Sequence, residues 1–155
     1  MDETVRWLTP EEQRAWRAFV RLQEKLGGRL ARMLQTESGL SVADFAVLVQ
    51  LTDVPAGRQR FLDLARALEW EKSRMSHHIA RMAKRGLVVR DECVEDGRGA
   101  FVVITDAGRE AIEGAAPLHV EAVRDLFLDH VTPAELRTLA QVSERVVAKL
   151  DEDAS

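Results

Sequence analysis

The sequence predicts a mainly α-helical (α+β) fold, in which four helices precede a single β-hairpin and two helices follow it. Apolar residues recur at helical spacing along most of the 155 residues. The spacing changes once, at residues 87–104, where two β-rich runs flank a polar stretch. Sequences typical of helix N-caps stand at the start of four helical segments. Together these features indicate one domain spanning residues 1–155.

The first two helices are each marked by an N-cap. Thr9 can cap a long amphipathic helix at residues 10–37, and Glu12 completes its capping box. Ser41, with Asp44 three residues later, opens a second helix by the same chemistry. This second helix should end before the Pro-Ala-Gly sequence that follows it, because those residues favour a turn.

Two further helices lead into the hairpin. A short helix covers residues 61–68, and a fourth, at about 73–85, ends at Gly86, a residue that suits a helix C-terminus. Residues 87–89 and 100–104 are rich in β-branched and apolar side chains and form the two predicted strands.

The last two helices contain prolines at different positions. Thr105 can cap the fifth helix, in which Pro117 should produce a kink or a break. Thr132 begins the sixth helix with a second Thr-Pro-x-Glu sequence. Apolar residues recur at helical spacing along both helices.

Composition excludes several classes of protein. The longest apolar runs are short, so we expect no membrane span, and the acidic start of the chain does not resemble a secretory signal. The single cysteine, Cys93, cannot form an intramolecular disulfide. It fits a reducing, cytoplasmic setting, and an intermolecular bridge or a reactive thiol stays open as an alternative.

Charge is distributed unevenly along the chain. The formal net charge is −4, which by itself argues against a nucleic-acid partner. Residues 72–90, however, carry six Lys or Arg and no acidic residue, so the other 136 residues carry −10. Such asymmetry predicts a basic binding surface on an acidic body.

The fourth helix has two chemically different faces. At 100° per residue, Met75, Ile79 and Met82 share a face that should pack inward. Arg74, near the helix start, is the best candidate for a bidentate guanine contact in the DNA major groove. The predicted DNA-binding residues of the helix are Lys72, Ser73, Arg74, Ser76, His77, His78, Arg81, Lys84 and Arg85. The alternative is an ordinary solvated basic face.

A helix, a short turn, a basic helix and a β-hairpin form the winged helix-turn-helix arrangement. The hairpin tip offers Arg98 between two glycines, which suits insertion into a narrow minor groove. Asp96 can hold Arg98 in place. An ordinary turn with an exposed arginine explains the same residues.

Over residues 10–150 the chain resembles the MarR family of bacterial transcriptional regulators. The resemblance is densest in Leu64-Ala65, residues 73–82, Arg85-Gly86-Leu87-Val88, Asp96-x-Arg98 and residues 104–108. It implies a homodimer formed by the first, fifth and sixth helices, with two winged lobes on a pseudo-palindromic double-stranded DNA operator. It also implies control by a small ligand or by oxidation. We therefore expect a repressor, with activation as the less favoured sign.

The expected lobe covers residues 41–105, and the expected dimerisation helices cover residues 10–37 and 106–150. The apolar faces of those helices exceed what so small a lobe can cover. The resemblance places an effector pocket between the lobe and the helices. Its candidate walls are Trp16, Phe19, Phe45 and His119. A small aromatic or phenolic effector is the expected ligand class, and the alternative is that Trp16 and Phe19 belong to the core or the dimer interface.

The chain departs from the family pattern at two places. Family wings often carry basic residues just after the position of Arg98, whereas Gly99 and Ala100 stand here. Thiol-sensing members carry a reactive cysteine near the start of the first helix, whereas Cys93 lies at the base of the predicted wing. Peroxide sensing by the usual geometry is therefore disfavoured.

The sequence gives little support for a metal site, a cofactor or enzymatic activity. His77 and His78 point about 100° apart on a helix, and His119 and His130 are about 16 Å apart, so no metal site is expected. We expect no cofactor and no enzymatic activity, because the sequence has neither a nucleophile elbow nor a phosphate-binding glycine loop. An architectural or protein-binding winged-helix protein without operator specificity is the remaining alternative.

Overall fold

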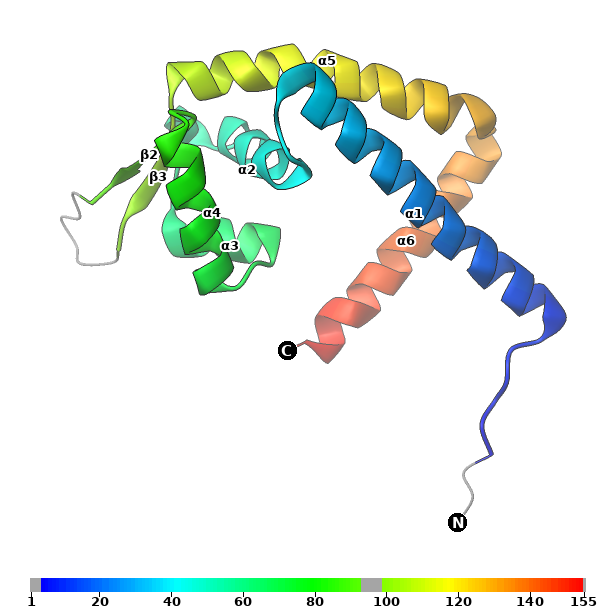
Figure 1. Ribbon diagram of the computed structural model, residues 1–155. Coiled ribbons are helices and arrows are strands. Elements are labelled where there is room, and N and C mark those ends of the chain that lie inside the picture. The colour runs from blue at the N-terminus through cyan, green and yellow to red at the C-terminus, as the bar shows by residue number, and fades with distance from the viewer. Residues whose placement is uncertain (1–3, 93–98, 155) are drawn as a thin grey trace. The chain divides into compact units, whose positions relative to one another are not determined.

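The computed structural model describes residues 4–92 and 99–154, and over this part of the chain it confirms the mainly helical α+β fold (Figure 1). By contacts the chain divides into two compact units, Met1–Pro117 and Leu118–Ser155. In chain order the elements are α1 (Pro10–Ser38), α2 (Val42–Thr52), η1 (Pro55–Gly57), β1 (Arg58–Arg60), α3 (Phe61–Leu68), α4 (Lys72–Lys84), β2 (Val88–Asp91), β3 (Phe101–Ile104), α5 (Asp106–Leu126), η2 (Leu128–His130) and α6 (Pro133–Asp153).

All three predicted capping boxes form. The Thr9 hydroxyl accepts a hydrogen bond from the Glu12 amide at 3.2 Å, and the Glu12 carboxylate accepts one from the Thr9 amide at 2.9 Å. Ser41 and Asp44 make the equivalent pair at the start of α2, and Thr132 makes it at the start of α6. Each cap contributes about 1 kcal/mol to the stability of its helix.

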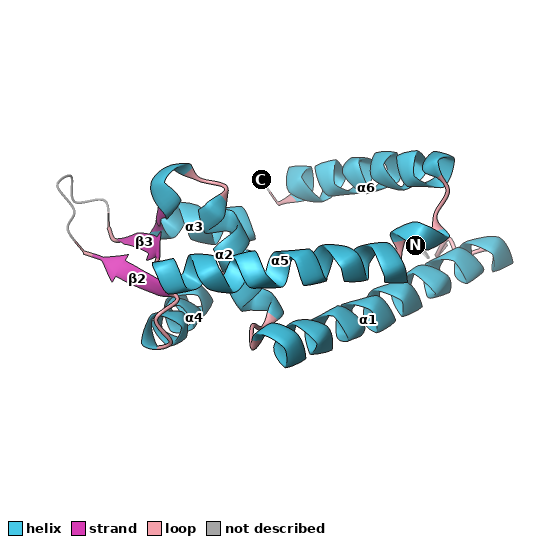
Figure 2. Cartoon of the chain, turned by 90° about the horizontal axis from the view of Figure 1, so that it is seen from above, coloured by secondary structure: helices cyan, strands magenta, loops and turns pink. Residues whose placement is uncertain are grey.

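The first unit also contains a three-stranded antiparallel sheet in the order β1-β3-β2. In the predicted hairpin Val88 pairs with Ile104, and Figure 2 shows β2 and β3 side by side next to α4. The sequence did not predict β1, whose residue Arg60 pairs with Phe101. Its three residues are all polar, so they lack the alternation of apolar and polar side chains that marks a half-buried strand, and their partners lie about forty positions away.

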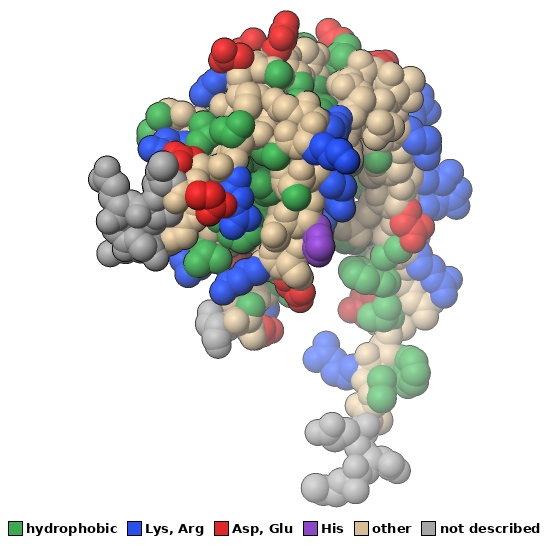
Figure 3. Space-filling model, turned by 60° about the vertical axis from the view of Figure 1, so that its left-hand side comes forward, with side chains coloured by type: hydrophobic (Ala, Val, Ile, Leu, Met, Phe, Trp, Pro, Cys, Tyr) green, Lys and Arg blue, Asp and Glu red, His purple; other side chains and the backbone are tan. Residues whose placement is uncertain are grey.

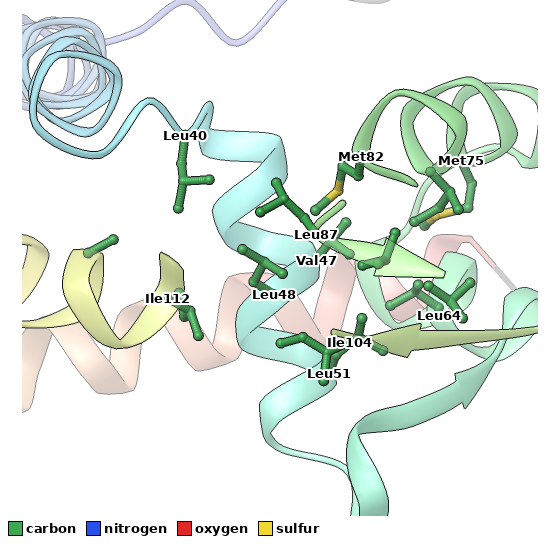
Figure 4. Close-up of a cluster of buried hydrophobic side chains, with 14 of the residues drawn as sticks. Leu40, Val47, Leu48, Leu51, Leu64, Met75, Met82, Leu87, Ile104 and Ile112 are labelled. Atoms are coloured by element: carbon green, nitrogen blue, oxygen red, sulfur yellow. The ribbon is translucent and has the colours of Figure 1, made fainter. Parts of the chain in front are cut away.

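The core of the first unit lies between α2, α3, α4, the sheet and the first half of α5. Figure 4 shows the buried side chains of these elements pointing toward one another. The predicted inward face of α4 is confirmed, because Met75, Ile79 and Met82 are at most 1% exposed. Burial of a side chain of this size contributes about 1.5–3 kcal/mol. These three residues therefore fix which side of α4 meets solvent.

The start of α5 is held against the end of α4. The Thr105 hydroxyl donates to the Gly86 carbonyl at 2.6 Å and accepts from the Gly108 amide at 3.0 Å. A methyl group on Gly108 would collide with the Leu87 carbonyl oxygen, so only glycine fits at this approach. Of the two outcomes predicted for Pro117, a kink or a break, the break does not occur, since α5 runs without interruption from Asp106 to Leu126.

The second unit consists of the end of α5, η2 and α6. No residue of α6 is buried within the described part of this unit. Its apolar side chains are exposed, and the large ones are Leu136, Leu139, Val142, Val146, Val147 and Leu150. Among the residues that the structure describes, no helix has the length and hydropathy needed to cross a membrane.

Candidate DNA-binding surface

A three-residue turn sets α4 against α3. The turn begins at Glu69, whose backbone is left-handed with φ of 55°, and the Trp70 amide donates to the Ala65 carbonyl at 2.9 Å. Figure 1 shows α3 and α4 next to each other. With Met75 and its inward neighbours anchored in the core, the opposite side of α4 faces solvent.

Most of the predicted residues of α4 lie on this exposed side. Figure 3 shows Lys and Arg side chains exposed over the molecule, with a histidine among them. Within α4 itself the exposed members are Lys72, Ser73, Arg74, Ser76, His77, Arg81 and Lys84, and Arg85, which follows the helix, is also exposed. The side therefore presents cations together with short hydroxyl and imidazole groups, which are the donors and acceptors that base edges and phosphates require.

Arg74 is braced by an aromatic ring. Its guanidinium carbon lies 4.2 Å from the ring centre of Trp70, which is half-buried in the turn before α4. A guanidinium over an indole face is attracted to it and loses conformational freedom. Sequence reasoning missed Trp70, although an aromatic residue four positions before Arg74 is a signal that such stacking is possible.

His78 was predicted to bind DNA from the flank of the outward face, and this prediction is wrong because its side chain is buried. His78 is buried, with its Nε2 atom 2.9 Å from Oδ1 of Asp44 and its ring edge-on to Trp70 at 5.4 Å. The approach to Asp44 is poorly aligned for a hydrogen bond, so the contact is mainly electrostatic. The helical periodicity placed His78 beside the outward face, and α2 and Trp70 cover that flank.

Arg85 is also engaged within the protein. Its Nη1 donates to Oδ2 of Asp44 at 2.7 Å, and its Nη2 donates to the Gly39 carbonyl at 2.9 Å. The Arg85 side chain remains about 45% exposed, so the ion pair is only partly shielded from water. Its first role is therefore to tie the end of α4 to the α1–α2 corner.

Burial and charge set the protonation states of this cluster. Burial raises the pKa of Asp44, but hydrogen bonds from Ser41 and Arg85 and the charge of Arg85 outweigh it and leave the pKa below its usual value. Burial lowers the pKa of His78. The Asp44 carboxylate opposes this, and the charges of Arg81 and Arg74 add to it. At neutral pH the carboxylate is therefore charged and the imidazole neutral.

Comparison with known proteins shows the family. A sequence profile of the MarR family matches residues 38–99. AbsC, a MarR family transcriptional regulator from Streptomyces coelicolor, is 38% identical with a TM-score of 0.91, and the match covers 96% of this chain and 99% of AbsC. The chain belongs to the MarR family. Sco3205, another MarR family regulator from that organism, has been solved in complex with DNA. It is 38% identical with a TM-score of 0.88, over 93% of this chain and 94% of Sco3205.

A more distant relative has the same kind of function. The transcriptional regulator HosA of Escherichia coli is 27% identical over 131 residues, which cover 84% of this chain and 95% of HosA. This MarR-family protein is a DNA-binding transcriptional regulator, and the named relatives are regulators rather than enzymes.

The winged lobe of this MarR-family protein carries further arginines that lie outside the predicted set of DNA-binding residues. Arg58 and Arg60 of β1 approach the ring of Phe101 at 4.0 and 4.8 Å, and Arg90 of β2 approaches Phe61 at 4.9 Å. The alternation in Arg-Gln-Arg is a weak signal for two cations on one side of a strand. The predicted wing residues Arg98 and Asp96, and Cys93, lie outside the described residues.

The four residues predicted for an effector pocket occupy different surroundings. Trp16 and Phe19 are exposed on α1 and lie 5.9 Å apart, whereas Phe45 is half-buried and packs against the core. His119 belongs to the second unit and lines a surface hollow with Val120, Val123, Arg124 and Leu128. Over residues 4–92 and 99–154, no group of His, Cys, Asp and Glu side chains is arranged to hold a metal ion.

Proposed function

We propose that this regulator acts in the cytoplasm as a homodimeric repressor, and that it binds a pseudo-palindromic operator by placing one α4 helix of each protomer in the major groove. The observation that carries the proposal is the composition of the exposed side of α4. That side combines four cations with Ser73, Ser76 and His77, and the buried side is anchored by apolar residues. An α-helix fits the width of the major groove.

Operator specificity is favoured over architectural binding by the residues at the start of α4. A protein that binds DNA by charge alone needs only Lys and Arg. Here Ser73, Ser76 and His77 stand near the braced Arg74, and short polar side chains of this kind bond base edges. We assign Lys72, Arg81 and Lys84 to the phosphates or flanking bases, and Arg98, supported by Asp96, to the minor groove.

The dimer is supported by exposed apolar side chains in each unit. In the first unit, α1 exposes Trp16, Phe19 and Leu22, and in the second unit α6 exposes six large apolar residues. Apolar surface of this extent normally meets a partner. We propose that residues 10–37 and 106–150 form the interface and that residues 41–105 form the DNA-binding lobe of a single domain.

We further propose that a small aromatic or phenolic compound controls DNA binding. An organohalide-sensing transcriptional regulator of the same fold, 16% identical, has been solved with 2,4-dichlorophenol bound. The exposed pair Trp16 and Phe19 offers this chain an aromatic surface that such a compound can stack on. An effector of this class changes DNA binding only if its affinity differs between the free and the DNA-bound conformations.

Footprinting on the DNA upstream of the protein's own gene tests the main proposal. We expect a protected site with two-fold symmetry, whose half-site centres lie about 10 bp apart on one face of the duplex. Sedimentation at micromolar concentration should give a dimer. Uniform coverage of the fragment would favour the architectural alternative, and a monomer would exclude the symmetric complex.

A further inference from the structure

We propose that His78 is a positioning residue for DNA recognition, because its neutral ring holds the Arg81 guanidinium on the exposed side of α4. The proposal rests on the assignment of that side to DNA. His78 itself touches no DNA in this account, since it is buried beneath the helix surface. It acts through Arg81, which stands in the outward set.

The contacts of the imidazole require one tautomer. Nη2 of Arg81 lies 3.1 Å from Nδ1 of His78. A guanidinium has donors and no acceptor, so Nδ1 must accept and cannot carry a proton. The proton of the neutral ring then lies on Nε2, which faces the Asp44 carboxylate at 2.9 Å. The ring therefore accepts from the exposed arginine, and its Nε2 lies in electrostatic contact with the buried anion without a well-aligned hydrogen bond.

The anion beneath His78 is itself fixed in place. Oδ2 of Asp44 accepts from the Ser41 amide at 2.9 Å and from Arg85 at 2.7 Å. Arg85 also donates to the carbonyl of Gly39, the C-cap of α1. A continuous set of contacts thus runs from the α1–α2 corner to Arg81. Because Asp44 cannot shift freely, the His78 ring has one favoured orientation.

The same buried layer braces a second arginine. Trp70 meets the edge of the His78 ring, and the Arg74 guanidinium lies over Trp70. Arg74 and Arg81 are seven residues apart, which places them two turns apart on the same side of α4. Both guanidiniums are therefore oriented before DNA arrives, which reduces the entropy lost on binding.

Protonation of His78 would remove the contact with Arg81. A proton on Nδ1 would face the guanidinium donors, so two donors and two positive charges would oppose each other. The charged groups around the ring are Asp44 from α2 and Arg74 and Arg81 from α4, while Trp70 contributes no charge. Asp44 would still attract the protonated ring through Nε2. Lowering the pH should therefore break the contact between His78 and Arg81, while Asp44 remains next to the ring.

A double-mutant cycle tests the coupling. The affinity for a labelled duplex carrying the protected upstream site is measured for wild type, Arg81→Ala, His78→Phe and the double variant. We expect each single change to weaken binding about tenfold and the double variant to bind no more weakly than Arg81→Ala alone. If the double variant loses affinity by the product of the two single losses, the two residues act independently and the proposed role of His78 is wrong. If Arg74→Ala, Arg81→Ala and Lys84→Ala all leave affinity unchanged, the DNA-binding surface itself is misassigned.

The pH dependence supplies a test that does not require a change at His78. In a His77→Gln background, which removes the exposed histidine beside it, affinity should fall as the pH is lowered below about 6.5, because the pKa of His78 lies below its usual value. Adding Arg81→Ala should make the affinity for DNA less dependent on pH over the same range. A fall of equal size with and without Arg81 would overturn the proposal.

Nitrogen NMR of the imidazoles tests the arrangement without DNA. At neutral pH the Nδ1 signal of His78 should be that of an unprotonated acceptor and should shift in Arg81→Ala, while His77 should not change. A His78 ring protonated at Nδ1 would contradict the contact with Arg81.

Discussion

The two sides of α4, a helix of thirteen residues, have different roles. The inward side stabilises the fold, and the outward side is the one that we propose binds DNA. On the inward side Met75, Ile79 and Met82 are almost fully buried, whereas the outward side carries exposed charge. A change on the inward side should therefore cost folding free energy and leave the chemistry that meets DNA intact. A change on the outward side should do the reverse. His78 and Arg85 show where the separation fails, because both connect the outward side to Asp44.

The largest expected effect is on the inward side. Ile79→Ala should lower the free energy of unfolding by about 2–5 kcal/mol, because it removes buried methyl groups and leaves a cavity. Urea denaturation measures the change. The matched control is His77→Ala, which lies on the exposed side of the same helix and should change stability by less than about 0.5 kcal/mol. Equal losses of unfolding free energy in the two variants would contradict the division of α4 into a stabilising side and an exposed side.

Features of the fold that depend on neighbouring residues were predictable from the sequence. The capping boxes at Thr9, Ser41 and Thr132 join residues three positions apart, and the apolar positions of α4 recur at helical spacing. The roles of Asp44 and Arg85 were not predictable, because the hydrogen bond between them spans 41 positions. The strand β1 was missed for the same reason, since its partner β3 follows about forty residues later.

The candidate site divides in the same way. Helical periodicity correctly separated the exposed cations of α4 from its apolar face. It misplaced His78, because periodicity gives the direction of a side chain and not what covers it. Only the packing of α2 and Trp70 decides that the flank of α4 at His78 is buried.

A smaller loss of folding stability is expected for a change at the start of α5, where Gly108 approaches the Leu87 carbonyl group. Gly108→Ala should lower the free energy of unfolding by about 1–3 kcal/mol, because the new methyl group meets the Leu87 carbonyl oxygen and the Ile104 side chain. Gly114→Ala is the matched control in the same helix. A methyl group there meets nothing within 4 Å, so the helix should gain about 0.5–1 kcal/mol. Thermal denaturation of the two variants should give shifts of opposite sign, and shifts of the same sign would refute the close approach.

The smallest expected effect is a pH dependence of folding stability that comes from the buried His78. Burial holds the pKa of His78 below its usual 6.5, against the attraction of Asp44. The unfolded chain therefore binds the proton more readily. The contribution of His78 to stability is complete above about pH 6.5 and falls as the pH decreases toward the lower pKa of the folded protein. Urea denaturation across this range should show the fall in wild type and in His77→Gln, and His78→Gln should reduce it. An unchanged slope in His78→Gln would assign the effect to another group.

The claim that the outward side of α4 reads DNA sequence is tested most directly by one ratio. The affinity for the protected upstream duplex is divided by the affinity for a duplex of shuffled sequence, in wild type and in Arg74→Ala. We expect the variant to lose about 1–3 kcal/mol on the specific duplex and much less on the shuffled one, so that the ratio falls. An equal loss on both duplexes would contradict base recognition by Arg74 and would leave it a contact to phosphate alone.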